Sequence, residues 1–552
     1  MVTAKRLYLY GVMGVALVPL LWGTWSILRL LARALGATAD DREAIGADVA
    51  LDELSLAVAL VMVALPVWLI HVVVVQRSLR SSPATAADEL ASPARATYFF
   101  LVLMITGAVA LLSLYEVVQQ LVGAAVAGTR TWGLSGALAA TVVSALAWTG
   151  HVWWRRADLR AAPTRTAGDW LTRAYLYGGL FITAVLLAFW LGQVATVVIS
   201  ELAAARVYWD PWEEAIVSPL AGTVGCATGW AAQWLIAASL IRADPPLGPA
   251  HRASRTRTAY FVAVLLVSAA AALSFVSLGG RHVLAETLGV WRPSEGSKLA
   301  SDIAGPLIMA VFFVVLGWWH RRRVLHEARA VGGPGRQLAV WRSALYVVGF
   351  AGLGALSIGM GWALFGLIEY LAATNDITQS AQLRAELTPG AATALAGLVV
   401  WAPTWRLAQQ DHATAPAVSA ASAPRRAYLL LVAALAVVFV MAALAYLTYQ
   451  AIRMLLDAGP TDDPAWAVST AAVAGVVLGY HLYLLRADGA ALAAAGPLEP
   501  TTDVAHGGER VIHTVELHVA PDTDLEALDV GIRGLLPADA ELRVVRDPEP
   551  AD

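Results

Sequence analysis

The first 80 residues contain the unit from which most of the chain is built. They read RLYLY at residues 6–10, an apolar run to about residue 31, an acidic loop at 40–53, and a second apolar run at 54–75 that contains WLIH (68–71) and is followed by QRSLR (76–80). Each apolar run has about the 20 residues that an α-helix needs to cross the hydrocarbon core of a bilayer. The stretch therefore predicts a two-helix membrane hairpin with its basic ends on one side and an acidic turn on the other.

The same unit recurs along the chain. Five later segments pair an arginine with a nearby tyrosine, at Arg95–Tyr98, Arg173–Tyr177, Arg257–Tyr260, Arg342–Tyr346 and Arg426–Tyr428. Along Tyr8, Tyr98, Tyr175, Tyr260, Tyr346 and Tyr428, the successive intervals are 90, 77, 85, 86 and 82 residues. Regular spacing of this kind indicates internal repeats. We expect first helices near residues 7–31, 98–122, 174–200, 260–280, 344–371 and 427–452, and second helices near 54–76, 134–154, 215–241, 302–319, 388–406 and 466–486.

These elements predict an all-α integral membrane protein with about twelve transmembrane helices in six tandem hairpins. The expected hairpins occupy residues 1–80, 81–160, 161–243, 244–330, 331–412 and 413–486, followed by a linker at 487–508 and a small tail at 509–552. The inter-hairpin segments 81–93, 244–253 and 413–424 are rich in Ala, Ser and Pro, which is typical of short flexible connections.

Composition agrees with this class. The 552 residues are 58% hydrophobic and 14% charged, whereas soluble domains have about 25% charged residues. The net charge of -3 argues against nucleic acid as a partner and leaves the lipid bilayer as the expected one. Cys226 is the only cysteine, which excludes an intramolecular disulfide. The chain has no phosphate-binding loop and no Gly-x-Ser-x-Gly or His-Glu-x-x-His motif, so we do not expect an enzyme.

The distribution of basic residues predicts the orientation. The N-terminus and the inter-hairpin segments carry 24 Lys and Arg, and the loops within the hairpins carry 10. Because cytoplasmic loops are enriched in Lys and Arg, both termini are expected in the cytoplasm. Only two of the 38 basic residues are lysine, which suggests a GC-rich bacterial genome and thus the bacterial inner membrane. The Arg–Tyr openings are expected to be interfacial anchors, with arginines that reach head groups and water.

Four second helices have a histidine near their cytoplasmic end: His71, His151, His320 and His481. Imidazoles on facing helices can ligate haem or a metal ion. Nearby arginines such as Arg155 disfavour a divalent cation, and no carboxylate lies next to these histidines in the sequence. We therefore interpret them as half-solvated interfacial residues and expect no cofactor, no metal site and no catalytic residue.

Polar residues in the outer halves of first helices form a second candidate site: Glu116, Gln119, Gln120, Gln193 and Glu369. Ionisable side chains inside a membrane are costly and are candidates for function. Glu116, about two turns inside its predicted helix, could form a proton or cation site with Gln119 and Gln120. The alternative is that the glutamines form interhelical hydrogen bonds that hold the bundle together.

The tail has a different character from the hairpins. Residues 510–519 alternate apolar and polar, which favours a strand, residues 522–536 have helical spacing, and residues 541–546 suggest a second strand. The pattern predicts a small cytoplasmic βαβ-like α+β unit at 509–552. So short a unit is marginal alone. We therefore expect it to pair with a copy of itself, to dock on the membrane part or to bind another protein.

The Arg-x-x-Tyr-x-Tyr opening and the Trp-x-x-His ending followed by arginines resemble a bacterial multi-pass membrane repeat domain of unknown function. The resemblance covers residues 5–486 and weakens in the fifth hairpin, where residues 401–405 lack the histidine. It implies the repeat architecture and no catalytic residue.

Two functions remain open from the sequence. One is a non-enzymatic membrane scaffold or signalling component, with the tail as its working end. The other is a small-solute or ion transporter or channel with Glu116 as its intramembrane carboxylate. Hairpins that all insert in the same orientation do not imply the inverted repeats that are common in secondary transporters.

Overall fold

The computed structural model describes most of the chain. The described residues are 2–35, 47–129, 131, 133–161, 169–202, 211–243, 247–252, 254–289, 300–372, 379–456, 464–495, 514–519 and 541–546. They divide into two compact units, Met1–Ala494 and Ala495–Asp552.

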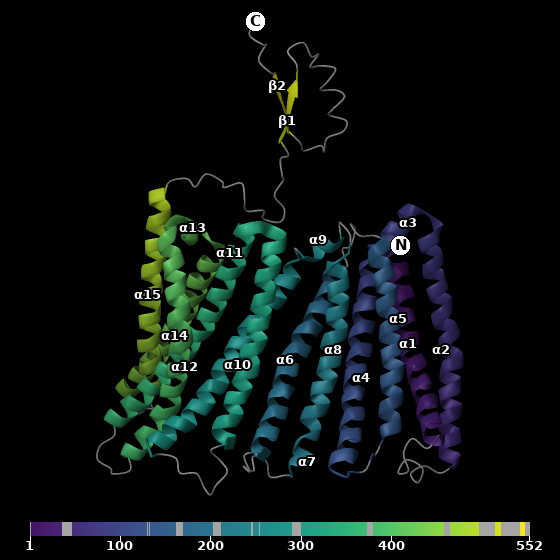
Figure 1. The fold of residues 1–552 in the computed structure, drawn as a ribbon, viewed down its shortest axis with the longest axis horizontal. Helices are drawn as coiled ribbons and strands as arrows, with labels where there is room; N and C mark the ends of the chain where they lie inside the picture. The colour runs from purple at the N-terminus through teal and green to yellow at the C-terminus, as the bar shows by residue number, and fades with distance from the viewer. Residues whose placement is uncertain are drawn as a thin grey trace. The chain divides into compact units, whose positions relative to one another are not determined.

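The larger unit is entirely helical in its described residues (Figure 1). Its first part contains α1 (Val2–Ala34), α2 (Ala47–Ser81), α3 (Pro83–Leu90), α4 (Pro93–Val126) and α5 (Leu134–Ala161). Its middle part contains α6 (Asp169–Leu202), α7 (Trp212–Ala215), α8 (Val217–Ile241), α9 (Leu247–Arg252), α10 (Arg255–Thr287) and the π-helix η1 (Ala300–Ala304). Its last part contains α11 (Gly305–Ala372), α12 (Gln379–Thr414), α13 (Pro416–Ala421), α14 (Ala423–Leu455) and α15 (Ala465–Ala495).

The long helices form six hairpins, which we group into three pairs. The first hairpin pair is α1, α2, α4 and α5; the second is α6, α8, α10 and the first part of α11; the third is the rest of α11 with α12, α14 and α15. We call the side with the N-terminus, α3, α9 and α13 the basic side and the side with α7 the opposite side (Figure 1).

The hairpin pairs follow one another in an open row. The described contacts join α2 to α1, α1 to α4 and α5, α4 to α6 and α8, α6 to α10 and α11, and these to α12 and α14. Figure 1 shows the same order from α2 at one end to α15 at the other. In each candidate span at most 33% of the residues in the apolar stretch are buried. Most of the helical surface is therefore available to lipid or to partners.

Eleven segments among the described residues are long and apolar enough to cross a membrane. The chain is thus a multi-pass α-helical membrane protein. The helix α5 is not one of the eleven although it has 28 residues. It contains His151, Arg155, Arg156 and Asp158, which make it less apolar than its neighbours.

The inter-hairpin segments differ from the expected flexible connections. The three within the hairpin pairs contain the short helices α3, α9 and α13. The helix α3 begins at Pro83 after Ser82, whose side chain accepts a hydrogen bond from the backbone N–H of Thr85. A side-chain oxygen that satisfies a free N–H in this way stabilises a helix start. The prediction of irregular linkers was therefore wrong at these places.

The helix α11 crosses the expected boundary between the fourth and fifth hairpins at residues 330 and 331. Helical structure continues from Gly305 to Ala372 through Gly332–Gly335, where a loop was expected. The helix α15 likewise continues to Ala495, nine residues into the expected linker 487–508. Helices thus extend beyond the apolar stretches that predicted them.

In the smaller unit, β1 (Thr514–Val519) and β2 (Glu541–Arg546) form a parallel two-stranded sheet with Thr514 opposite Glu541. Both strands lie within the segments that the alternation pattern predicted. The helix expected at 522–536 lies outside the described residues.

Candidate functional site: buried arginine clusters on the basic side

The first hairpin pair contains a buried network of charged side chains on its basic side. Arg95 on α4 donates from Nε and Nη2 to the two carboxylate oxygens of Asp158 on α5, both at 2.8 Å. Its Nη1 donates to the hydroxyl of Tyr10 on α1 at 2.8 Å. Tyr10 donates to Glu89 on α3 at 2.5 Å, and the second oxygen of Glu89 accepts from Arg6 Nε at 2.8 Å. These five residues, the first arginine cluster, connect four helices.

The sequence places Arg95 at the N-terminus of α4, three residues after the N-cap Ser92. The guanidinium is fully buried, with 0% exposure. A planar guanidinium matches a carboxylate through two parallel hydrogen bonds, and a buried ion pair is stable only when its remaining polar atoms also have partners. Tyr10 supplies that third partner.

The third hairpin pair repeats this arrangement. Arg425 on α14 donates to both carboxylate oxygens of Asp488 on α15, at 2.6 and 2.8 Å, and to Tyr346 on α11 at 3.4 Å. Arg342 on α11 donates to the two oxygens of Asp411 on α12 at 2.8 and 3.2 Å. These five residues form the third arginine cluster. Arg425 has 1% exposure, so its guanidinium is buried as that of Arg95 is.

The second hairpin pair has the same aromatic frame. Its tyrosine rings, Tyr177 and Tyr260, lie 5.7 Å apart, and the corresponding distance is 5.7 Å for Tyr10 and Tyr98. Arg257 is buried and lies 5.5 Å from the ring of Phe261, as Arg95 does from Phe99. We call this group the second arginine cluster.

A tyrosine–histidine pair lies beside each cluster. Tyr98 and His151 Nε2 are 3.0 Å apart, and Tyr260 and His320 Nε2 are 2.7 Å apart. In the third pair the rings of Tyr428 and His481 have centroids 5.7 Å apart, the same distance as Tyr98 and His151.

Each of these histidines also bonds through Nδ1 to a carbonyl oxygen four residues earlier, at 2.7 Å for His151, 2.9 Å for His320 and 2.7 Å for His481. A carbonyl oxygen can only accept, so Nδ1 carries a proton in each of these histidines. In the first two pairs both ring nitrogens are therefore engaged, Nδ1 with the carbonyl and Nε2 with the tyrosine hydroxyl.

The predicted interfacial character was wrong for these three histidines, which are 5%, 1% and 1% exposed. His71 differs because its side chain is only partly buried, with Nδ1 at 2.7 Å from the Val67 carbonyl. Among the described residues, no three His, Cys, Asp or Glu side chains are placed to hold a metal ion.

The arginines do not behave as the predicted interfacial anchors. Arg95, Arg257 and Arg425 are buried, and so are Tyr10, Tyr98 and Tyr428. Tyr8, by contrast, is 63% exposed and retains an anchor's position. Buried partners replace the head groups and water that were expected around the buried arginines.

The five intramembrane polar residues are not brought together in one site. Gln120 donates to Glu116 at 2.6 Å within α4, and the Glu116 side chain is exposed. Gln119 donates to Ser218 on α8 at 3.4 Å, which is the predicted interhelical role for a glutamine. Gln193 lies on α6, and Glu369 lies three residues before the end of α11.

Glu116 is 23 residues after Pro93, the start of α4. At 1.5 Å per residue this is about 35 Å along the helix, longer than a hydrocarbon core of about 30 Å. The depth of Glu116 in the bilayer stays a prediction, because α4 continues for ten residues beyond it to Val126.

The cluster carboxylates were not predicted, although the sequence contains a signal for two of them. Asp158 and Asp488 each follow the buried histidine by seven residues and the buried arginine by 63. Glu327 follows His320 by seven residues in the second pair, and its side chain is outside those that the structure describes. The arginines themselves follow Ser92, Ser254 and Ser422 by three residues and precede the buried tyrosines by three.

A combined pattern, Ser-x-x-Arg-x-x-Tyr followed by His-x6-Asp/Glu, therefore marks the second hairpin of each pair. This pattern also corrects the opening predicted for the sixth hairpin. The arginine of the repeat there is Arg425, which binds Asp488, and not Arg426.

Comparison with known families gives the same grouping by two hairpins. A domain of unknown function, DUF5671, matches residues 6–131, 173–315 and 342–480, which together exceed half of the chain. The chain belongs to the DUF5671 family. Each DUF5671 match begins at the first arginine of a hairpin pair and extends into its second hairpin, so the predicted resemblance to a repeat domain of unknown function is confirmed. No curated protein and no solved structure matches the chain.

Proposed function

We propose that this DUF5671 protein is a non-enzymatic membrane scaffold or signalling component of the bacterial inner membrane. In this proposal it has twelve spans, with α5 as the twelfth, and the basic side faces the cytoplasm. Both termini are then cytoplasmic, and a βαβ-like tail at 509–552 binds a protein partner or a second copy.

The arginine clusters carry the proposal. Charged residues that serve transport face a cavity or a water path. In the first and third clusters, each carboxylate instead accepts two hydrogen bonds, and the tyrosine on the first helix joins the arginine of the second hairpin to the first hairpin. Such hydrogen-bonded ion pairs hold helices in place, which supports a structural role for the clusters.

The open row gives a second argument. Neighbouring pairs are also joined on the basic side, where Arg155 donates to Thr172 at 3.0 Å and Arg156 donates to Ser239 at 2.9 Å. A row with so much apolar surface offers long lateral faces for other membrane proteins. Such faces suit a platform on which partners assemble.

Proton flux into proteoliposomes separates the scaffold from the transporter alternative. We expect wild type and Glu116→Gln to give the flux of protein-free liposomes, with the Gln119→Ala variant as a matched control on the same helix. A flux above that background that disappears in Glu116→Gln would instead support transport through this carboxylate.

Removal of residues 497–552 tests the tail. Because the two units are separate and α15 ends at Ala495, the shortened chain should keep the thermal unfolding temperature of the full chain. Cross-linking in cells should capture a specific partner or a second copy with the full chain only. Identical cross-linked products from both chains would contradict a binding role for the tail.

A further inference from the structure

In each hairpin pair, one residue of the first helix corresponds to one residue of the last helix. The residue types at these two places differ among the three pairs. The position is fifteen residues after Tyr10, Tyr177 and Tyr346 and fifteen residues before the buried histidines. The residue pairs there are Trp25 and Gly136, Gly192 and Gly305, and Gly361 and Trp466.

In the first two pairs the helices pack closely at this position. Trp25 Nε1 donates to the Gly136 carbonyl at 2.9 Å. In the second pair a Cβ on Gly192 would overlap the sulfur of Met309, and one on Gly305 would lie 3.3 Å from Thr196 Cγ2. Glycine therefore permits both close approaches.

In the third pair the corresponding position is open. A Cβ on Gly361 would meet nothing within 4 Å. The Trp466 ring lies against Tyr446 of α14, with centroids 4.7 Å apart. An indole where the other pairs have glycine keeps α15 away from α11.

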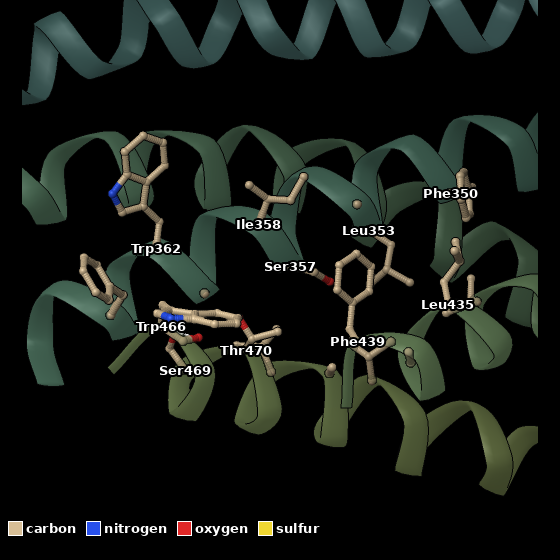
Figure 2. Close-up of a pocket in the computed structure, with 18 residues that line it drawn as sticks. Phe350, Leu353, Ser357, Ile358, Trp362, Leu435, Phe439, Trp466, Ser469 and Thr470 are labelled. Atoms are coloured by element: carbon tan, nitrogen blue, oxygen red, sulfur yellow. Dashed lines mark hydrogen bonds between the residues drawn. The ribbon is translucent and has the colours of Figure 1, made fainter. Parts of the chain in front are cut away.

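The result is a cavity of about 480 Å³ between α11, α14 and α15 (Figure 2). Its wall is apolar and includes Leu353, Phe365, Leu435, Phe439, Val473 and Val477. The hydroxyl of Ser469 donates to the Trp466 carbonyl at 2.9 Å, so it is satisfied within its own helix. Figure 2 shows Trp362 and Trp466 at one end and Phe350 and Leu435 at the other.

The depth of the cavity identifies its surroundings. Val432–Phe439 lie 9 to 16 residues after the start of α14, or about 14 to 24 Å along the helix, within a hydrocarbon core of about 30 Å. The cavity is open to the surroundings of the helices, and an apolar space of this kind does not hold water stably. The fluid that surrounds the protein at this depth is lipid hydrocarbon.

We propose that this cavity binds one acyl chain of a membrane phospholipid from the leaflet on the opposite side. Trp466 is the second residue of α15 and thus lies at the opposite end of the span, where indoles mark the membrane interface. The chain enters beside Trp362 and Trp466 and extends inward toward Phe350. This binding site is independent of the scaffold function proposed above.

A phosphatidylcholine with a diazirine in its acyl chain tests the site in nanodiscs of phosphatidylethanolamine and phosphatidylglycerol. We expect photolabelling to concentrate on Leu435, Phe439 and Val473 of the full chain. The internal control is Val438 and Val476, which are exposed on α14 and α15 but do not line the cavity. Equal labelling of the two sets would overturn the proposal.

Variants make the test specific. Gly354→Leu with Gly361→Leu fills the cavity, because a Cβ at either glycine meets open space, and should reduce labelling at least fivefold. Gly475→Leu, also in open space but outside the cavity wall, should leave it unchanged. An unchanged thermal unfolding temperature of the double variant excludes a general folding defect. Unchanged labelling in the double variant, or an equal loss in Gly475→Leu, would contradict the proposal.

Native mass spectrometry after delipidation identifies the occupant. One retained phospholipid is expected with the full chain and none with the double variant. A retained free fatty acid, or no retained lipid in either, would overturn the assignment.

Discussion

The first and third hairpin pairs share one arrangement on the basic side and differ at the opposite end. In both, a buried arginine binds an aspartate on the last helix and a tyrosine on the first. At the opposite end, Gly136 allows α5 to contact α1, whereas Trp466 lines a cavity. What the two pairs share is therefore the arginine–aspartate–tyrosine group, and the helix packing beyond it is free to vary.

The position of the second carboxylate also differs between the first and third clusters. In the first pair it is Glu89 on the connecting helix α3, and it bonds to both Arg6 and Tyr10. In the third pair it is Asp411 on α12, and it pairs with Arg342. The first cluster is thus a continuous network that includes the connector. In the third, Arg342 and Asp411 form an ion pair beside the group of Arg425, Asp488 and Tyr346.

Loss of an aspartate should have the largest effect, and the effect should be larger in the third pair. We expect Asp488→Ala to lower the free energy of unfolding by about 3–5 kcal/mol, because it leaves a buried charge without its partner. Asp158→Ala should fall at the lower end of that range, since Arg95 keeps Tyr10 at 2.8 Å with Glu89 behind it. Denaturant unfolding in detergent micelles measures both, and a larger loss for Asp158→Ala would contradict the comparison.

Removal of both charges should restore most of the stability. Replacing Arg425 with Met and Asp488 with Leu removes the ion pair and its desolvation cost together. Such replacements are often neutral or stabilising, so the double variant should lie within about 1–2 kcal/mol of wild type. If it is as unstable as Asp488→Ala, the aspartate has a role other than charge pairing.

Loss of the arginine on the first helix should increase hydrogen exchange in the connecting helix of the first pair but not of the third. Arg6→Ala removes the 2.8 Å bond to Glu89, and a hydrogen bond to a charged group contributes about 1.5–3 kcal/mol. Faster hydrogen exchange is expected across α3. Arg342→Ala removes a bond to α12 instead, so exchange in α13 should not change. Equally faster hydrogen exchange in α3 and α13 would contradict this comparison. It would show no difference between a second carboxylate on the connecting helix and one on α12.

The sequence predicted the hairpins well because each span must be apolar and about 20 residues long. It did not predict the clusters, since Asp158, Asp411, Asp488 and Glu89 all lie beyond the expected spans. A hydropathy boundary marks where charged residues begin, but backbone hydrogen bonds continue the helix past it, as in α15 to Ala495. The clusters form in this extra helical length.

Exposure of Tyr8 and burial of Tyr10 illustrate a second limit. Both residues are tyrosines of the same RLYLY opening. They differ because Tyr10 lies on the face of α1 that meets α4 and Tyr8 does not. Periodicity was too weak to assign that face, because apolar residues surround the helix. The repeated Ser-x-x-Arg-x-x-Tyr and His-x6-Asp/Glu spacings contain this information when the hairpins are compared in pairs.

The smallest expected effect concerns the position that Gly136 holds on α5 and Trp466 holds on α15. Gly136→Trp gives the first pair the residue that the third has, and a Cβ there would meet Arg29 Cδ at 3.5 Å and Trp25 at 3.9 Å. The indole should displace α5 from α1 and cost about 1–2 kcal/mol, as overpacking does. The variant should also gain acyl-chain photolabelling at Val109. Gly150→Trp, on the same helix in open space, is the control. A loss of stability without new labelling would mean that Trp466 alone does not open the third pair, and that the bulk of Phe439 in place of Val109 contributes as well.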